Sequence, residues 1–191
     1  MKNSYYYLGA NHTVDLIVVN PEREILLIKR GNSSEACPGM WAIPGGFIDT
    51  DAKKGEAWRE GAETPEQAAV RELMEETNLT LCNPDLVFVG VFEGNQRDPR
   101  DNEQSWSKSH AFLYMIPQSV YDAQKESIKG LDDAEDADWK TVEEIHALDL
   151  AFDHKLIIQT ALGKFNNSLI DRASGSQDLE HSRTKSHTPR P

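Results

Sequence analysis

The sequence contains little cysteine, no long apolar run and a shortage of positive charge. Its two cysteines, Cys37 and Cys82, lie far apart and lack the spacing of a metal site, so we expect reduced thiols. No apolar run approaches the roughly 18 residues of a membrane span, and the first residues lack the apolar core of a signal peptide. These absences favour a cytoplasmic protein that does not interact with membranes.

The charge balance argues against a nucleic-acid partner. Lys and Arg together number 20, Asp and Glu number 32, and the formal net charge is −12. Proteins bind nucleic-acid phosphates mainly through Lys and Arg, so we expect no binding to nucleic acid. A small phosphorylated ligand remains compatible with this charge, because acidic residues can bind cations and the cations can then bind phosphates.

The pattern of the chain indicates one mixed α and β domain. We expect this domain over residues 1–170 and a disordered polar tail over 171–191. β-rich runs predict strands at 13–19, 24–28, 41–43, 86–92 and 110–116, and a short one at 138–140. The turn residues between the first two runs predict a hairpin.

The stretch Arg71-Glu72-Leu73-Met74-Glu75-Glu76 concentrates three carboxylates in one place. On a helix they fall within an arc of roughly 100°, and apolar side chains take the opposite arc. Those apolar residues are Ala69, Val70, Leu73 and Met74. Like charges at this spacing repel by roughly 0.2–0.5 kcal/mol per pair, and a hard divalent cation would reverse that cost. A solvated charged face is the alternative, and the helix alone does not decide between them.

The ends of this helix are marked in the sequence. Thr64 is a good N-cap, Pro65 suits the first helical position, and Gln67 completes a capping box. Asn78 marks the C-terminal end, because Asn tolerates the left-handed conformation found there. A last helix is expected from about residue 154 to 165, with Asp153 as its cap.

Gly45-Gly46, Glu63 and the run from Arg71 to Leu79 together resemble the signature of the Nudix hydrolases. The family pattern is Gly, five residues, Glu, seven residues, then Arg-Glu-apolar-x-Glu-Glu-x-Gly-apolar. The chain departs from it in two places: Asn78 replaces a glycine, and sixteen residues rather than five separate Gly46 from Glu63. The resemblance implies an α+β Nudix fold, in which a mixed β-sheet is sandwiched between α-helices.

The resemblance also implies roles for individual residues. Glu72, Glu75 and Glu76 would be catalytic by ligating Mg²⁺ or Mn²⁺, helped by the Gly45 carbonyl. The structural members of the motif would be Gly46, Glu63 and Arg71. The metal ions would bridge a diphosphate and lower the pKa of the water that attacks phosphorus.

Residues 97–106 are similar to a loop of Nudix enzymes that hydrolyse ADP-ribose, in which Asp-Pro-Arg precedes a Trp. Arg97 and Arg100 would clamp phosphate oxygens, and Trp106 would stack on a base or pack beside it. The alternative is a turn built by Asp98 and Pro99, with both arginines solvated.

Three features leave alternatives open. The general base outside the helix is either Glu103 or a member of an acidic cluster, which consists of Asp132, Asp133, Glu135 and Asp136. Trp58, in the insert at 50–61, either covers the substrate or lies on a surface excursion. Phe152-Asp153-His154 recurs in relatives resembling ADP-ribose hydrolases, but we interpret it as a capped helix start.

The resemblance therefore predicts a metal-dependent hydrolase of a nucleoside diphosphate linked to another moiety, most directly ADP-ribose cleaved to AMP and ribose 5-phosphate. The alternatives are NADH, a dinucleoside polyphosphate or a modified nucleotide as substrate, or a non-catalytic nucleotide-sensing Nudix domain. The sensor is disfavoured because about twenty polar residues follow Leu169, too few for a winged helix, and because all three helix glutamates are present. Related enzymes often form homodimers, so a dimer is compatible with this interpretation.

Overall fold

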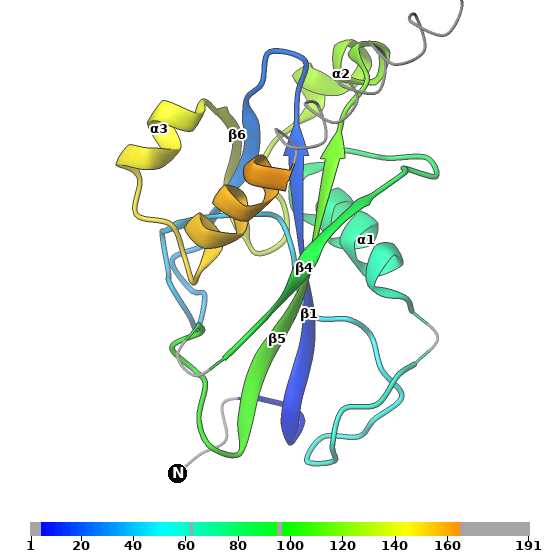
Figure 1. The fold of residues 1–191 in the computed structure, drawn as a ribbon, viewed down its shortest axis with the longest axis vertical. Helices are drawn as coiled ribbons and strands as arrows, with labels where there is room; N and C mark the ends of the chain where they lie inside the picture. Colours follow the sequence, from blue (N-terminus) through cyan, green and yellow to red (C-terminus); the bar gives the residue numbers. More distant parts are fainter. Residues whose placement is uncertain (1–4, 62, 95–96, 165–191) are drawn as a thin grey trace, which may run out of the picture.

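A computed structural model describes residues 5–61, 63–94 and 97–164 of the chain (Figure 1). The elements in chain order are β1 (Gly9–Val19), β2 (Ile25–Arg30), β3 (Trp41–Ala42), α1 (Pro65–Thr77), β4 (Val87–Glu93), β5 (Ser105–Met115), α2 (Gln118–Gln124), a 3₁₀ turn (Lys125–Ser127), β6 (Ala134–Lys140) and α3 (Val142–Ala147). Residues 154–164 are also helical. Phe165, the expected end of that last helix, and the expected tail at 171–191 lie outside the described residues.

The strands form one mixed sheet in the order β3-β2-β1-β5-β4, and β6 pairs with β2. β1 and β5 run parallel at its centre, in register from Gly9 with Ser105 to Val19 with Met115. The other pairs are antiparallel, including the predicted hairpin of β1 and β2, which closes at Val19 and Ile25. The prediction of a mixed sheet is therefore confirmed.

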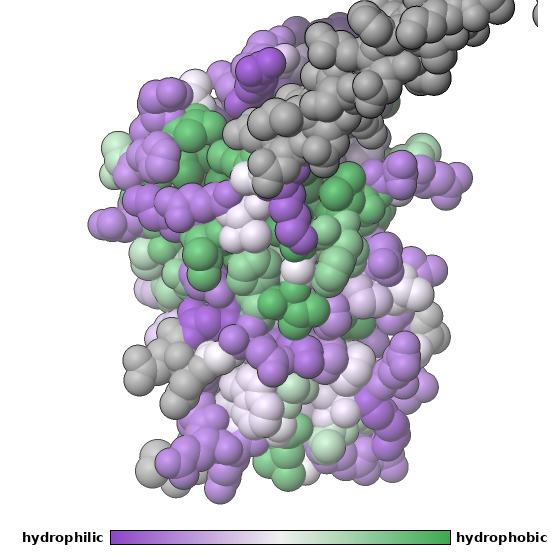
Figure 2. Space-filling view, viewed as in Figure 1, coloured by the Kyte–Doolittle hydropathy of each residue, from purple (hydrophilic) through white to green (hydrophobic). Residues whose placement is uncertain are grey.

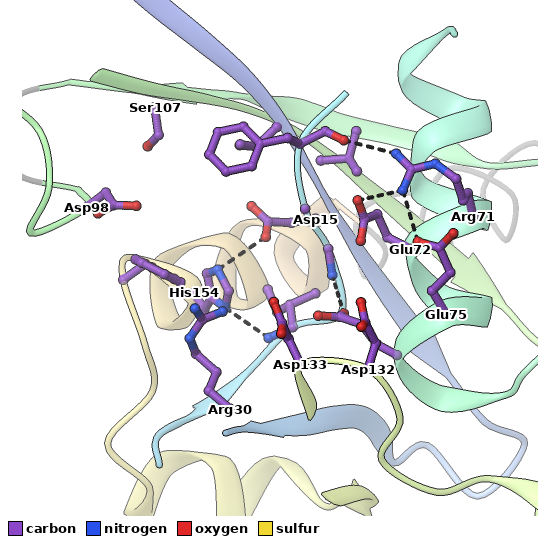
Figure 3. Close-up of a pocket in the computed structure, with 18 of the residues that line it drawn as sticks. Asp15, Arg30, Arg71, Glu72, Glu75, Asp98, Ser107, Asp132, Asp133 and His154 are labelled. Atoms are coloured by element: carbon purple, nitrogen blue, oxygen red, sulfur yellow. Dashed lines mark hydrogen bonds and ion pairs between the residues drawn. The ribbon is translucent and has the colours of Figure 1, made fainter. Parts of the chain in front are cut away.

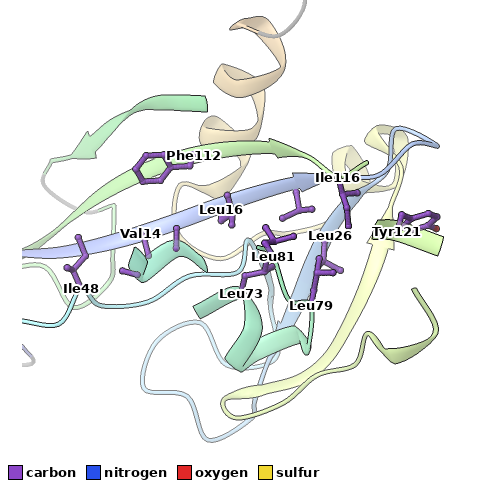
Figure 4. Close-up of a cluster of buried hydrophobic side chains, with 13 residues drawn as sticks. Val14, Leu16, Leu26, Ile48, Leu73, Leu79, Leu81, Phe112, Ile116 and Tyr121 are labelled. Atoms are coloured by element: carbon purple, nitrogen blue, oxygen red, sulfur yellow. The ribbon is translucent and has the colours of Figure 1, made fainter. Parts of the chain in front are cut away.

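Helices cover both faces of the sheet, as Figure 1 shows for α1 on one side and the 154–164 helix on the other. Alternate side chains of β1 explain this arrangement, because successive residues of a strand point to opposite faces. Val14, Leu16 and Val18 pack in one buried cluster with Leu73 of α1 (Figure 4). Ile17 and Val19 pack in the other cluster, which contains the helical residues Ile157, Ile158 and Ala161. The C-terminal half of β1 is buried on both faces, and for that reason its residues 14–19 form an apolar run interrupted only by Asp15.

The glutamate helix begins and ends where the sequence predicts. The Thr64 side chain accepts a hydrogen bond from the Gln67 N–H and the Gln67 side chain accepts one from the Thr64 N–H, which completes the capping box. Asn78 adopts φ 62° at the C-terminal end. The prediction that Met74 belongs to the packed face of this helix is wrong. Ala69 and Leu73 are fully buried, but Met74 is 43% exposed. Met74 lies at the margin of the apolar arc, where its side chain is only partly covered.

Two other expectations need correction. The Asp153 carboxylate does not cap the last helix through any hydrogen bond of the described residues; it accepts hydrogen bonds from Arg97 instead. The short helices α2 and α3 were not expected, although Thr141 and Glu144 form a capping box at the start of α3. Each has only six or seven residues, too few to show a helical period in sequence.

The edge strand β4 leaves several large apolar side chains exposed, and Figure 2 shows apolar surface among the polar side chains of this face. The most exposed of them on β4 are Val87, Phe88 and Val91. A homodimer stays a prediction. Among the described residues, no helix combines the length and apolar character needed to cross a membrane.

Candidate active site

A cavity of about 360 Å³ opens beside the middle of β1 and the carboxylate face of α1 (Figure 3). Its walls come from seven separate parts of the chain: β1, the end of β2, the glycine loop at 43–47, α1, residues 97–107, and two loops around residues 132 and 152. The sheet brings these segments together, because the loops that leave its central strands meet at one place. Figure 3 shows the carboxylates of α1 on one side and Asp98, Ser107 and His154 on the other.

The acidic wall of the cavity is formed by Glu72, Glu75 and Glu76. Glu76 is only 5% exposed, and its carboxylate accepts a hydrogen bond of 2.9 Å from the Gly45 N–H. Burial, reinforced by the nearby charge of Glu72, raises the pKa of Glu76 well above its usual range. A cation bound beside this carboxylate would favour its ionised form.

Arg71 links the acidic wall to the loop before the helix. Its Nε donates to Glu63 at 2.7 Å, its Nη1 donates to Glu72 and Glu75 at 2.8 and 3.1 Å, and its Nη2 donates to the Phe47 carbonyl at 3.0 Å. The hydrogen bond from Arg71 lowers the pKa of Glu63, which therefore stays ionised. One guanidinium thus joins three carboxylates and a backbone carbonyl across the insert.

Both glycines of the loop have neighbouring atoms close to where a Cβ would lie. A Cβ on Gly45 would collide with the carbonyl of Val14, and one on Gly46 would collide with the Glu72 carboxylate. β1 fixes the loop through hydrogen bonds from the Val14 N–H to the Gly46 carbonyl and from the Leu16 N–H to the Pro44 carbonyl. The loop is therefore pressed between β1 and α1.

The residues of the acidic wall fit a hard divalent cation in their chemistry. The donors are carboxylate oxygens, which Mg²⁺ and Mn²⁺ prefer, and one of the carboxylates is buried with its pKa raised. In the part of the chain that the structure describes, however, no three acidic, His or Cys side chains stand as a ready ligand set. In this structure Arg71 donates to oxygens of Glu72 and Glu75, and the Gly45 N–H donates to an oxygen of Glu76. A cation bound here would share these carboxylates with the hydrogen-bond donors.

The structure pairs Arg97 with buried carboxylates. Its Nε and Nη2 donate to Asp153, with a shortest distance of 2.7 Å, its Nη1 donates to Ser107, and its Nη2 lies 3.4 Å from Asp15. The Arg97 side chain is 9% exposed. Burial lowers the pKa of Arg97, but its carboxylate partners outweigh burial and the pKa is raised. Every nitrogen of this guanidinium is engaged within the protein.

Arg100 lies beside Asp98, and it is paired with this carboxylate rather than solvated as the alternative expected. Its Nε and Nη2 donate to the Asp98 carboxylate, with a shortest distance of 2.7 Å, and the guanidinium lies 5.3 Å from the centre of the Tyr5 ring. The Tyr5 hydroxyl donates to Asp101 at 2.7 Å. Arg97 and Arg100 therefore line the cavity as members of ion pairs.

Three residues predicted for the site lie outside this cavity. Trp106 and Glu103 line a separate depression near the end of β4. Trp58 is stacked on His12 with ring centres 3.8 Å apart, and it packs against the core cluster beneath α1. The insert pairs with the N-terminal segment, since Ala57 bridges to Leu8. The structure thus places the insert away from the cavity.

The structure adds residues that sequence reasoning did not select. Asp15, Arg30 and His154 all line the cavity. Asp15 is the one charged residue within the apolar strand run at 13–19, and this position is the feature of the sequence that could have identified it as a site residue. His154 was seen only as a helix start, and Arg30 lay outside the strand expected at 24–28. Of the acidic cluster, Asp132 and Asp133 line the cavity, whereas Glu135 pairs with Lys29 at 3.8 Å.

Comparison with known proteins agrees with this geometry. Residues 10–161 match the family model of the NUDIX domain, and the chain belongs to the Nudix family. It is 33% identical over 159 residues to an ADP-ribose pyrophosphatase of Methanocaldococcus jannaschii, covering 83% of this chain and 77% of that protein. It is also 31% identical over 158 residues to an ADPR responsive transcriptional repressor of Acinetobacter baylyi, covering 81% of this chain and 54% of the repressor.

A solved structure shows the same fold. The NUDIX domain of Shewanella oneidensis NrtR, complexed with ADP-ribose, superposes with a TM-score of 0.63 at 24% identity, over 82% of this chain and 89% of that one. The chain spans about half the length of the Acinetobacter repressor.

Proposed function

We propose that this protein is a divalent-metal-dependent Nudix hydrolase that cleaves ADP-ribose to AMP and ribose 5-phosphate. The observation that carries the proposal is the cavity in which the carboxylates of α1 face a wall that contains Arg30, Asp15 and His154. The relative from Methanocaldococcus jannaschii, named as an ADP-ribose pyrophosphatase, supports the choice of substrate.

In this proposal the residues of the cavity have three separate roles: metal binding, support of the loop and proton transfer. Glu72, Glu75 and Glu76, with the Gly45 carbonyl, would hold Mg²⁺ or Mn²⁺, which supplies charge stabilisation and an acidic bound water. Arg71 and Glu63 hold the loop against α1 through their 2.7 Å ion pair. Asp132 and Asp133 are the cavity-lining candidates for a proton acceptor outside the helix, and Glu103 is the candidate in the separate depression.

The test is release of AMP from ADP-ribose with and without Mg²⁺, and Glu76→Gln is the control. We expect metal-dependent release by the natural protein and its loss in the variant. Full activity of Glu76→Gln would contradict the metal assignment. A panel with NADH, dinucleoside polyphosphates and modified nucleotides, ranked by kcat/KM, decides among the substrates.

A second function, nucleotide sensing without hydrolysis, is supported by two observations. The Acinetobacter baylyi relative is a transcriptional repressor, and Arg71 occupies two of the three helix glutamates in this structure. A sensor would bind ADP-ribose in calorimetry, with or without Mg²⁺, and would release no AMP over hours. A hydrolase would turn the ligand over under the same conditions.

A further inference from the structure

The carbonyl groups on either side of Gly45 are held by β1, but the Gly45 carbonyl is not. The Leu16 N–H donates to the Pro44 carbonyl at 3.0 Å, and the Val14 N–H donates to the Gly46 carbonyl at 2.9 Å. Among the described residues, no backbone N–H donates to the carbonyl of Gly45. Because this oxygen is the one assigned to the metal ion, its position depends on how the rest of the loop is held.

The start of the loop is held by a side chain from the last helix. The Ile43 N–H donates to Nδ1 of His154 at 2.9 Å, a contact between residues 111 positions apart in sequence. Ile43 is 1% exposed and His154 is 3% exposed, so water does not reach this hydrogen bond. The bond therefore depends on the imidazole alone.

Pro44 connects this hydrogen bond to Gly45. The proline ring fixes φ of Pro44 at about −65° and restricts the preceding Ile43 to extended backbone, so few freely rotating bonds separate the Ile43 N–H from the Gly45 carbonyl. On the other side, the Gly45 N–H donates to Glu76 at 2.9 Å. A displacement of the Ile43 N–H would therefore move the Gly45 carbonyl relative to the carboxylates of α1.

Asp15 determines which nitrogen of His154 can accept this hydrogen bond. Nε2 of the imidazole lies 3.2 Å from Oδ1 of Asp15, and Figure 3 shows the ring directed at this carboxylate. A proton on Nε2 leaves the lone pair on Nδ1, which is the form that a backbone donor requires. The Ser109 hydroxyl donates to the other oxygen of Asp15, and the Arg97 guanidinium lies 3.4 Å from that oxygen. The carboxylate that orients the ring is thus itself fixed.

We propose that His154 is a positioning residue of the metal site. It fixes the Gly45 carbonyl through its hydrogen bond to the Ile43 N–H, and Asp15 holds the imidazole in the form that accepts this bond. His154 supplies no ligand to the metal and acts through the backbone. The inference rests on the proposed function for the metal ion, but metal binding can be measured without turnover.

Two variants separate the two hydrogen bonds of His154. The amide of Asn ends where Nδ1 lies, so His154→Asn keeps an acceptor for the Ile43 N–H and loses the donor to Asp15. The longer amide of Gln ends where Nε2 lies, so His154→Gln keeps the donor to Asp15 and loses the acceptor. Ser109→Ala is the matched control, because it removes another buried hydrogen bond to Asp15 and leaves the bond to Ile43 in place.

The first measurement is amide hydrogen exchange of Ile43, followed by NMR without metal. We expect slow exchange in the natural protein, His154→Asn and Ser109→Ala, and exchange faster by roughly tenfold or more in His154→Gln. The second measurement is Mn²⁺ affinity, followed by electron paramagnetic resonance without substrate. We expect affinity within about twofold of the natural protein for His154→Asn and Ser109→Ala, and roughly tenfold weaker for His154→Gln.

A merely structural role for His154 predicts a different pattern. Mn²⁺ affinity would then follow the melting temperature, whichever of the two hydrogen bonds the variant keeps. In our assignment His154→Asn loses stability with its bond to Asp15 but keeps its Mn²⁺ affinity. If His154→Gln does not fold, His154→Asn carries the test, because Mn²⁺ binding weaker by roughly tenfold in that variant would contradict the proposal.

Equal Mn²⁺ affinities in His154→Asn and His154→Gln would overturn the positioning role. If the natural protein still hydrolysed ADP-ribose with Mg²⁺, that result would leave the proposed enzyme function standing. Mn²⁺ affinity that follows the Ile43 hydrogen bond, in a protein that never hydrolyses ADP-ribose, would keep the positioning role and reject the enzyme function. Absence of any Mn²⁺ binding by the natural protein would overturn both.

Discussion

The Nε2 atom of His154 lies 3.2 Å from Oδ1 of Asp15, while its Nδ1 accepts a hydrogen bond of 2.9 Å from the Ile43 N–H. Because a backbone N–H only donates, Nδ1 is unprotonated and the ring proton on Nε2 faces Asp15. One imidazole therefore joins the last helix, β1 and the chain just before Gly45. It connects the glycine loop of the acidic wall to the buried ion pairs of the opposite wall.

Asp15 gives the fold an acid-sensitive step. Burial alone would raise the pKa of Asp15, but His154, Arg97 and Ser109 outweigh burial and lower the pKa from 3.8 to about 2. Because folding lowers the pKa of Asp15, its ionised carboxylate stabilises the fold at pH values above its ordinary pKa. This stabilisation is lost as the pH falls from about 4 to about 2. From this group we expect a loss of about 2 kcal/mol in the free energy of unfolding. Urea denaturation at a series of pH values measures it.

The control for this step is Asp15→Asn. It should be less stable than the natural protein at pH 6, and its stability should depend less on pH between 4 and 2. An unchanged pH dependence in the variant would show that other carboxyl groups account for the acid sensitivity.

Arg97→Ala should be strongly destabilising. It leaves Asp15 and Asp153 without their common cation in a largely buried position, and breaking such a pair costs roughly 3–5 kcal/mol. Arg59→Ala, which breaks an exposed pair with Glu56, should cost about 0–1 kcal/mol and is the control. Equal urea midpoints for the two variants would show that Arg97 is not a structural cation.

Glu76→Gln should stabilise the protein in the absence of metal while removing activity. The buried carboxylate is unfavourable when ionised, because burial and Glu72 raise its pKa, and the amide carries no charge. We expect a higher melting temperature in EDTA and a fall in Mg²⁺-dependent hydrolysis of roughly 100-fold or more. Glu75→Gln, at a more exposed position, should change the EDTA melting temperature little. A lower melting temperature for Glu76→Gln would mean that its bond to Gly45 outweighs the cost of burial.

Substituting the two loop glycines should separate function from stability. In Gly46→Ala the new methyl group meets the Glu72 carboxylate, the far end of a flexible side chain that can move aside. In Gly45→Ala it meets the backbone carbonyl of Val14, which cannot move without shifting β1. We expect Gly46→Ala to keep nearly the natural melting temperature but to bind Mn²⁺ more weakly, by roughly tenfold. Gly45→Ala should lower the melting temperature. Similar melting temperatures for both would contradict this distinction.

Glu103→Gln and Asp133→Asn test which wall supplies a proton acceptor. Asp133 lines the cavity, whereas Glu103 lies with Trp106 in the separate depression. We expect Glu103→Gln to retain kcat within about twofold and Asp133→Asn to lower it by roughly 100-fold, measured across pH 6–9. A larger loss of kcat in Glu103→Gln than in Asp133→Asn would instead assign the proton acceptor to Glu103.

Local signals explain why much of the fold could be predicted. The capping box at Thr64, the left-handed end at Asn78 and the apolar runs of β1 and β2 each depend on residues close in sequence, and all of these expectations are confirmed. The short helices α2 and α3 could not be predicted in the same way, because six or seven residues carry too little periodicity.

The sequence by itself determined the carboxylate helix, its caps and its glycine loop, because the spacing of these residues on a helix and a turn depends only on local geometry. The tertiary structure decided which charges meet. Arg97 and Arg100 had the right chemistry for phosphate, but folding brings them to Asp15, Asp153 and Asp98. Folding also leaves Arg30 beside Phe152 without a carboxylate partner among the described residues. Pairing between distant residues follows from how the strands and loops pack, and no local pattern encodes it.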